Sequence, residues 1–255
     1  MNLVRREASL PNIQLREGAP EMDSETADSK VTTFVLSEMV LRYVIDEPVI
    51  SRVLEDIERA TLHHIWLKVD HDLARLRDLH DAARQQVVDL QQAALGAGLV
   101  VAQRFIVQVH SAIDDWARAL VDLRKLKIEP PSKGQLMQAG RFRSPGASYT
   151  RIEQVNALAN LFKHESEWGN WNTEKGLAKK TIEVARTIGA EPLGPNINVG
   201  VRAITNRNRH PLAAIGKLLH RWAKAAEWHA IRHMGAEDRR SHVRKQIAAI
   251  VAKAS

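Results

Sequence analysis

This chain of 255 residues contains no cysteine, and only 5% of its residues are aromatic. Without cysteine it cannot form disulfides, thiolate zinc sites or a cysteine nucleophile. The sequence also lacks a Gly-rich phosphate loop, a dinucleotide fingerprint and the Gly-x-Ser-x-Gly elbow of many hydrolases. None of the common catalytic signatures is therefore present, and we predict neither a cofactor nor a bound metal.

Long apolar runs are missing as well. The longest, from Ala93 to Ala102, has ten residues, whereas a transmembrane helix needs about 20. The first residues do not contain the apolar segment of a signal peptide. We therefore expect a soluble, cytoplasmic protein with no membrane partner.

Glycine and proline are confined to a few places, which leaves long segments with helical periodicity. The clearest begins at Leu99, where apolar residues recur at steps of three and four. Its members are Leu99, Ala102, Ile106, Val109, Ile113, Trp116, Leu120 and Leu123. We predict an all-α fold in which this helix and a preceding helix over 49–95 form a long antiparallel hairpin. Gly96 and Gly98 provide the turn, and a further four to five helices pack against the hairpin.

The remaining segments are assigned from composition and from helix start and stop signals. Residues 1–30 are acidic and read as a flexible arm, followed by a single all-helical domain over 31–255. The Pro- and Gly-rich, basic loop 126–149 is the point where this domain would be subdivided. Further helices are predicted over 33–43, 150–168, 173–188, a short segment ending near 208, 211–234 and 238–252. The helix at 150 starts with a Thr-x-x-Glu capping box.

Charge is distributed unevenly along the chain. Residues 1–100 contain 11 Lys and Arg against 17 Asp and Glu, whereas residues 101–255 contain 26 against 13. A concentrated basic region favours a polyanionic partner, most often nucleic acid. A solvated helical surface that is rich in Lys and Arg is the alternative.

One face of the helix predicted over 150–168 is unusually rich in functional groups. Glu153, Asn156, Asn160, Lys163, His164 and Glu167 lie within an arc of about 100°. Asparagine is a poor choice for an exposed helical face, and the last turn favours cations through the helix dipole. We interpret the face either as a site, with His164 and Lys163 at its centre, or as the solvated side of an amphipathic helix.

The stretch Ala-Asn160-x-x-Lys163-His164-x-x-Glu167-Trp168 follows a helix that reads His110-Ser-Ala-Ile-Asp-Asp-Trp. Together they resemble a group of uncharacterised bacterial helical proteins in which a Thr-rich helix and a Gly come next. Thr181 and Gly189 stand in similar places. That group is distantly similar to HEPN-type domains, which are all-helical, usually dimeric and often metal-independent ribonucleases of defence and toxin systems. The resemblance covers residues 97–190.

The resemblance implies a catalytic role for three residues. His164 would be the acid/base, Lys163 would steady phosphate charge, and Asn160 would orient the imidazole or the ribose. His164 has no arginine at the spacing typical of HEPN domains, so Lys163 or Arg151 would supply the cation. A homodimer through the long helices is an expected assembly.

A second candidate lies near the helix that starts at Pro211. Arg207, Arg209 and His210 precede its first free N–H groups and would form an anion cradle. Along this helix lies a basic ridge with an interleaved aromatic, which we interpret either as a surface that binds nucleic acid or as a solvated charged face with Trp228 packed against a neighbour. Its members are Lys217, Arg221, Lys224, Trp228 and Arg232.

Two hypotheses follow. The protein is either a HEPN-like protein that acts on RNA, as a ribonuclease of a defence or toxin system, or a non-catalytic helical module. That module would bind nucleic acid or a protein through the basic C-terminal half. A purely structural helical protein is a third alternative. His229 and His233, four residues apart, are interpreted as packed or interfacial histidines rather than metal ligands. His63, His64 and His71 are interpreted as part of a charged helical surface rather than a metal cluster.

Overall fold

The computed structural model describes residues 24–62, 81–140, 142–143, 147–168, 171, 176–191, 194 and 196–235. The elements in this part of the chain are α1 (Ser24–Asp46), α2 (Val49–Ile57), the π-helix η1 (Glu58–Leu62), α4 (Asp81–Arg124), α5 (Lys133–Met137), α6 (Arg151–Trp168), α7 (Gly176–Arg186), α8 (Asn196–Ile204) and α9 (Pro211–His233). These residues form no β-strand, only an isolated bridge between Arg143 and Thr150. The predicted all-α fold is confirmed.

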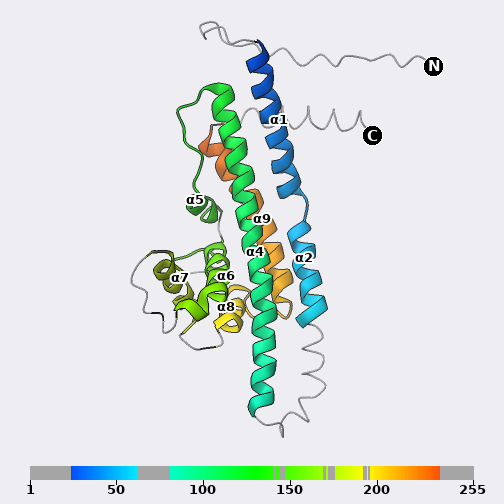
Figure 1. The fold of residues 1–255 in the computed structure, drawn as a ribbon, viewed down its shortest axis with the longest axis vertical. Coiled ribbons are helices and arrows are strands. Elements are labelled where there is room, and N and C mark those ends of the chain that lie inside the picture. The colour runs from blue at the N-terminus through cyan, green and yellow to red at the C-terminus, as the bar shows by residue number, and fades with distance from the viewer. Residues whose placement is uncertain are drawn as a thin grey trace, which may run out of the picture.

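The longest helix, α4, is the axis around which the other elements are arranged (Figure 1). α1 and α2 follow one another along α4 and run in the opposite direction (Figure 1). α9 packs against both α2 and α4. α6 also packs on α4, and α7 and α8 in turn contact α6. The fold is therefore long in the direction of α4.

The predicted hairpin turn at Gly96 and Gly98 is wrong, because α4 passes through both glycines without interruption. A Cβ atom at Gly98 would lie 2.6 Å from the side chain of Leu212 in α9. One at Gly96 would overlap the ring of Phe162 in α6. The glycines thus let two helices approach α4 closely, at a cost in helix propensity of about 1 kcal/mol each. The antiparallel partners of α4 are α1 and α2, and the connection through residues 63–80 lies outside the described residues.

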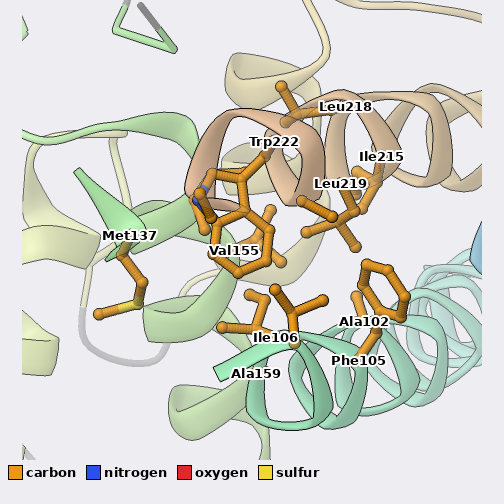
Figure 2. Packing of buried hydrophobic residues seen from close by; sticks show 14 of the residues in the cluster. Ala102, Phe105, Ile106, Met137, Val155, Ala159, Ile215, Leu218, Leu219 and Trp222 are labelled. Atoms are coloured by element: carbon orange, nitrogen blue, oxygen red, sulfur yellow. The ribbon is translucent and has the colours of Figure 1, made fainter. Parts of the chain in front are cut away.

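The apolar seam predicted on α4 faces the core, and its members from Leu99 to Leu120 are buried. Trp222 of α9 is fully buried against this core, and its Nε1 donates a hydrogen bond of 2.8 Å to the carbonyl oxygen of Leu136 in α5. Figure 2 shows this indole among side chains of α4, α6 and α9, including Ile106 and Val155. Burying an indole stabilises a fold by about 4–6 kcal/mol before entropic costs.

The capping box at the start of α6 is confirmed. The Thr150 N–H donates to Oε2 of Glu153 at 2.7 Å, and the Glu153 N–H donates to Oγ1 of Thr150 at 3.2 Å. A second capping box starts α5, where Ser132 and Gln135 exchange equivalent hydrogen bonds. The predicted loop 126–149 therefore contains a short helix. Five residues are too few to show helical periodicity, so the sequence did not predict it.

Other boundaries differ from the predictions in both directions. α1 begins at Ser24 rather than near Thr33, so the predicted arm is helical from residue 24 on. α8 begins at Asn196, inside a segment predicted as loop, whereas α9 closely matches its predicted bounds. Residues 1–23 of the arm and the predicted helix 238–252 lie outside the described residues.

The segment Gln85–Arg124 of α4 is long and apolar enough to span a membrane, and it is the one such helix among the described residues. Half of its most apolar window is buried inside the fold. Core helices of soluble proteins meet the same criterion, and the buried seam accounts for the apolar composition of this one.

Candidate functional site

The predicted polar face of α6 is divided between the protein interior and the surface. Asn160 is only 6% exposed, and its Oδ1 accepts a hydrogen bond of 2.7 Å from Nε2 of Gln103 in α4. The same Nε2 donates to Oδ1 of Asn156 at 3.1 Å. At the start of the helix Glu153 is buried as well. The interpretation as a fully solvated face is therefore wrong, because α6 packs this face on α4 and Asn160 joins the two helices.

Two lysines from different elements lie beside these amides. Nζ of Lys133, the first residue of α5, donates to Oδ1 of Asn156 at 3.3 Å. Burial lowers the pKa of Lys133, and the positive charge of Lys163 lowers it further. Within the described residues neither lysine is paired with a carboxylate. Gln103, Lys133, Asn156, Asn160 and Lys163 form what we call the amide–lysine cluster.

His110 of α4 lies next to this cluster. Burial lowers the pKa of its imidazole, the charge of Asp114 raises it, and the charge of Lys133 lowers it. The charge of Asp114 is thus only one of the influences on the pKa of the ring. The carboxylate of Asp114 also accepts a hydrogen bond of 2.8 Å from Nε of Arg118, with which it forms an ion pair at the surface.

His164 occupies the exposed end of α6. Its Nδ1 lies 3.0 Å from Oε2 of Glu167, and its ring stacks on that of Trp168 at a centroid distance of 5.4 Å and an angle of 16°. The imidazole is 39% exposed, and Lys163 beside it is exposed too. A carboxylate at Nδ1 favours the tautomer whose Nε2 is free to accept a proton. The one hydrogen bond found for Asn160 goes to Gln103, so Asn160 is held by α4 rather than by His164.

The first turn of α9, predicted as an anion cradle, already contains an anion from the same chain. The N–H of Ala213 donates to Oε2 of Glu58 at 2.9 Å, and Nδ1 of His210 lies 3.8 Å from Oε1. Glu58 is buried, and burial raises the pKa of its carboxyl, although Ala213 and His210 partly oppose this. The helix terminus is therefore capped internally by η1.

Arg207 and Arg209 are exposed on the turn between α8 and α9. Arg207 has a positive φ of 58°, and its N–H donates to the carbonyl oxygen of Arg202 at 2.8 Å, which closes the C-terminus of α8. The neighbouring Asn206 contacts Arg151, the first residue of α6, at 3.5 Å. His164 is thirteen residues further along α6, or about 20 Å along its axis. The turn and His164 therefore belong to separate sites.

The ridge predicted on α9 forms one exposed surface, which we call the basic face. It consists of Lys217, Arg221, Lys224, Trp228 and Arg232, all of them exposed. The guanidinium of Arg232 lies 5.9 Å from the centroid of the Trp228 ring, which is 49% exposed. The single acidic residue of α9, Glu227, is buried and paired with Arg42 of α1. No carboxylate of α9 therefore offsets the charge of the basic face.

The histidines of α9 do not assemble a metal site. His229 and His233 stack with ring centroids 6.4 Å apart, and His233 Nε2 lies 2.9 Å from the carbonyl oxygen of Glu129. Burial lowers the pKa of His229, and the charge of His233 adds to this effect. Across the described ranges no group of three or more potential ligands is found. The residues His63, His64 and His71 lie outside those ranges.

The sequence predicted the basic face, the His164 region and three members of the amide–lysine cluster, but not Gln103 and Lys133. Its members come from three helices, and α5, which supplies Lys133, was not predicted. One signal was available: Gln103 is a polar residue next to Ala102 in an otherwise apolar stretch of α4. A buried amide in such a position requires a hydrogen-bonding partner on a neighbouring helix.

Comparison with known proteins gives no match for this chain among family models, curated proteins or solved structures.

Proposed function

We propose that this protein is a helical module that binds nucleic acid, with RNA as the expected ligand, through the basic face of α9. The observation that carries the proposal is the composition of that face. Four cations and a half-exposed indole occur together, while the one carboxylate of the helix points inward to Arg42. A phosphate backbone is the ligand that benefits most from such a surface.

The spacing of the cations suits an extended polyanion. From Lys217 to Arg232 the helix rises about 22 Å, which is long enough for several successive phosphates to contact it. Binding would release condensed counterions, so the affinity would fall steeply as salt rises.

Trp228 would add base stacking to the attraction between the cations and the phosphates. This indole is 49% exposed and lies among the cations of the basic face. Base stacking on an aromatic ring contributes about 1–3 kcal/mol per base and tolerates any sequence. An unpaired base beside a bound backbone would therefore cover Trp228, which favours single-stranded over duplex ligands.

The test is a salt titration of binding to labelled single-stranded RNA and to duplex DNA. We expect tight, salt-sensitive binding that is stronger for the single strand. The variant K217E/R221E/K224E should bind at least tenfold more weakly, with a slope of log K against log salt that is shallower by about two. The control K179E/K180E/R202E changes three exposed cations of α7 and α8 and should bind normally. Absence of wild-type binding at moderate salt, or equal loss in both variants, would contradict the proposal.

A second candidate function, RNA cleavage at His164, is favoured by the contact between its Nδ1 and Glu167. This pair resembles the way in which a carboxylate orients a histidine that acts as a general base. Lys163, exposed on the same turn, would steady the phosphate charge. Cleavage should then persist in chelator and disappear in His164→Ala, as seen on a gel of the products. His233→Ala serves as the control. Unchanged cleavage in His164→Ala would exclude this role, while binding through the basic face could still hold.

A further inference from the structure

Large apolar side chains are exposed mainly along α1 and α2. Of the ten such residues among those described, six lie on these two helices: Leu36, Met39, Val40, Tyr43, Val49 and Val53. We call these six residues the apolar stripe, because on α1 they are related by steps of three and four and share one side of the helix. An exposed apolar surface of this kind is typical of a site that another segment or molecule covers.

A groove with a volume of about 490 Å³ lies beside the apolar stripe, between α1, α2 and α4. Val40, Tyr43 and Val49 belong to both the stripe and the groove. On the other side the groove is lined by α4, which contributes the buried Phe105 and the exposed Gln108. A helix that packs on the stripe would therefore also contact α4.

The C-terminal end of α9 lies at the level where the apolar stripe begins. α9 runs antiparallel to α1 and α2, because its first turn contacts Glu58 whereas Glu227 contacts Arg42. From Glu227 to its end α9 rises about 10 Å, and from Arg42 back to Leu36 the rise along α1 is about 9 Å. Gly235, with a φ of 59°, then ends the helix in the left-handed conformation. Residues 236–255 therefore start at the level of the stripe.

Residues 236–255 have the length and the apolar period that would match the stripe. The helix predicted over 238–252 would be about 22 Å long, and the rise from residue 36 to residue 49 is about 20 Å. Apolar residues of this segment are four and three residues apart, so in a helix they form a single apolar edge. These residues are Val243, Ile247 and Ile250.

The charges of the segment and of the stripe's surroundings are mainly opposite. Residues 239–255 contain five Lys and Arg and no Asp or Glu. Within 36–49 and among the residues that line the groove, the exposed charged side chains are three carboxylates and one cation: Asp46, Glu47, Asp115 and Arg104. Opposite charges at the margin of a helix contact favour that contact. Residues 1–23, the other end of the chain, are less suited, because they contain three Lys and Arg against four Asp and Glu.

We propose that residues 236–255 turn back at Gly235 and pack, as a helix, on the apolar stripe of the same chain and along the groove. This helix would run parallel to α1 from the same level, so that Val243 lies near Val40 and Ile247 near Tyr43. The contact removes apolar side chains of both helices from water, which stabilises the docked arrangement. The inference is independent of the proposed function, because none of these residues belongs to the basic face.

The test makes use of the absence of cysteine, because an introduced thiol is then the only one in the chain. In Val40→Cys the thiol should react with a maleimide about tenfold more slowly than in Leu90→Cys, as expected if docking is favoured by about 1.4 kcal/mol. Val40 and Leu90 are exposed to a similar extent, 54% and 59%, and Leu90 does not line the groove.

Two further substitutions show whether residues 236–255 provide the protection. Ile247→Asp in the Val40→Cys protein should abolish it, because a carboxylate then replaces an apolar side chain of the contact. Ala249→Asp introduces the same residue on the opposite side of the predicted helix and should leave the protection intact. In the Leu90→Cys protein neither substitution should change the labelling rate, which controls for an altered fold.

A cross-linking experiment distinguishes the proposed occupant from the others. Val40→Cys/Val243→Cys treated with a short bismaleimide should give a product with the mass of one chain. A product with the mass of two chains would mean that the segment belongs to a second copy. Protection that survives Ile247→Asp would mean that a different segment, such as residues 1–23, covers the stripe. Equal labelling of Val40→Cys and Leu90→Cys would mean that nothing covers it. Each of these three results would overturn the proposal.

Discussion

The two tryptophans of α9 lie on the same helix but in opposite environments. Trp222 is fully buried and hydrogen-bonded to Leu136, whereas Trp228 is 49% exposed beneath Arg232. The difference lies in which face of the helix each residue occupies. The side of Trp222 belongs to the core, and the side of Trp228 is exposed. We therefore expect that stability and the proposed binding can be changed separately within one helix.

Charge follows the same division. Glu227 belongs to the inward side, where it forms a buried ion pair with Arg42 of α1. The outward side has only positive charge. A buried pair of this kind is costly to break by removing one partner, so the arrangement both links α1 to α9 and keeps the only carboxylate of α9 away from its exposed surface.

The largest contrast is expected from truncating the two indoles. Trp222→Ala should lower the free energy of unfolding by about 3–5 kcal/mol, because it leaves a cavity and an unpaired carbonyl at Leu136. Trp228→Ala should change it by less than about 0.5 kcal/mol. Urea unfolding followed by circular dichroism measures both. Equal losses in the two variants would show that the two faces are not distinct.

A smaller loss is expected where α9 meets α2. A Cβ atom at Gly216 would lie 2.8 Å from Cα of Ser51, which is backbone and cannot rotate away. Gly216→Ala should therefore cost about 1–3 kcal/mol through overpacking, measured by the same unfolding experiment. Gly134→Ala in α5 is the control: its nearest neighbour is Oγ of Ser132 at 4.0 Å, so it should be neutral or stabilising. A neutral Gly216→Ala would mean that α2 moves freely against α9.

The exposed indole should affect binding by about the same amount as one stacked base. Trp228→Ala is expected to weaken single-stranded RNA binding by about 1–3 kcal/mol and to leave the salt dependence unchanged, because no phosphate contact is lost. Fluorescence anisotropy at two salt concentrations checks both points. Trp228→Phe should retain most of the affinity. A shallower salt slope in Trp228→Ala would indicate that the indole acts by positioning Arg232.

The smallest expected effect is on pH dependence. Burial lowers the pKa of His110, His220 and His229 in the folded protein, whereas in the unfolded chain histidine titrates near 6.5. Below about that pH the unfolded chain therefore binds more protons. The stability contributed by the neutral rings is complete above about pH 6.5 and falls as the pH decreases. The raised pKa of Glu58 acts in the opposite sense.

Thermal unfolding between pH 7.5 and 5.5 measures this dependence. In H110Q/H220Q/H229Q the loss of stability on acidification should be reduced, while the wild type loses stability throughout the range below about pH 6.5. Identical profiles for the two proteins would show that these histidines are not the groups responsible.

Much of the fold could be predicted because its signals are local. The capping box of Thr150 and Glu153 and the Pro at the start of α9 each fix a helix end through neighbouring residues. Gly96 and Gly98 could not be interpreted from the sequence alone. The same two residues are typical of a turn and of a close helix contact, and only the positions of Phe162 and Leu212 decide between them.

In the candidate sites too, local patterns could be predicted from the sequence and contacts between distant residues could not. The basic face could be predicted because one helical period brings its members together on α9. The role of Asn160 could not, because its partner Gln103 lies 57 residues away on α4. The position of Lys133 depends on α5, a helix that begins only because Ser132 and Gln135 cap it.

The carboxylate of Glu58 accepts a hydrogen bond from the N–H of Ala213 in the first turn of α9. An external anion would have to compete with this carboxylate for the same N–H group. A tethered group is present at a high effective concentration, so a dissolved phosphate can enter there only by exchange with it. External anions would then be selected by the basic face of α9 and not by its N-terminus.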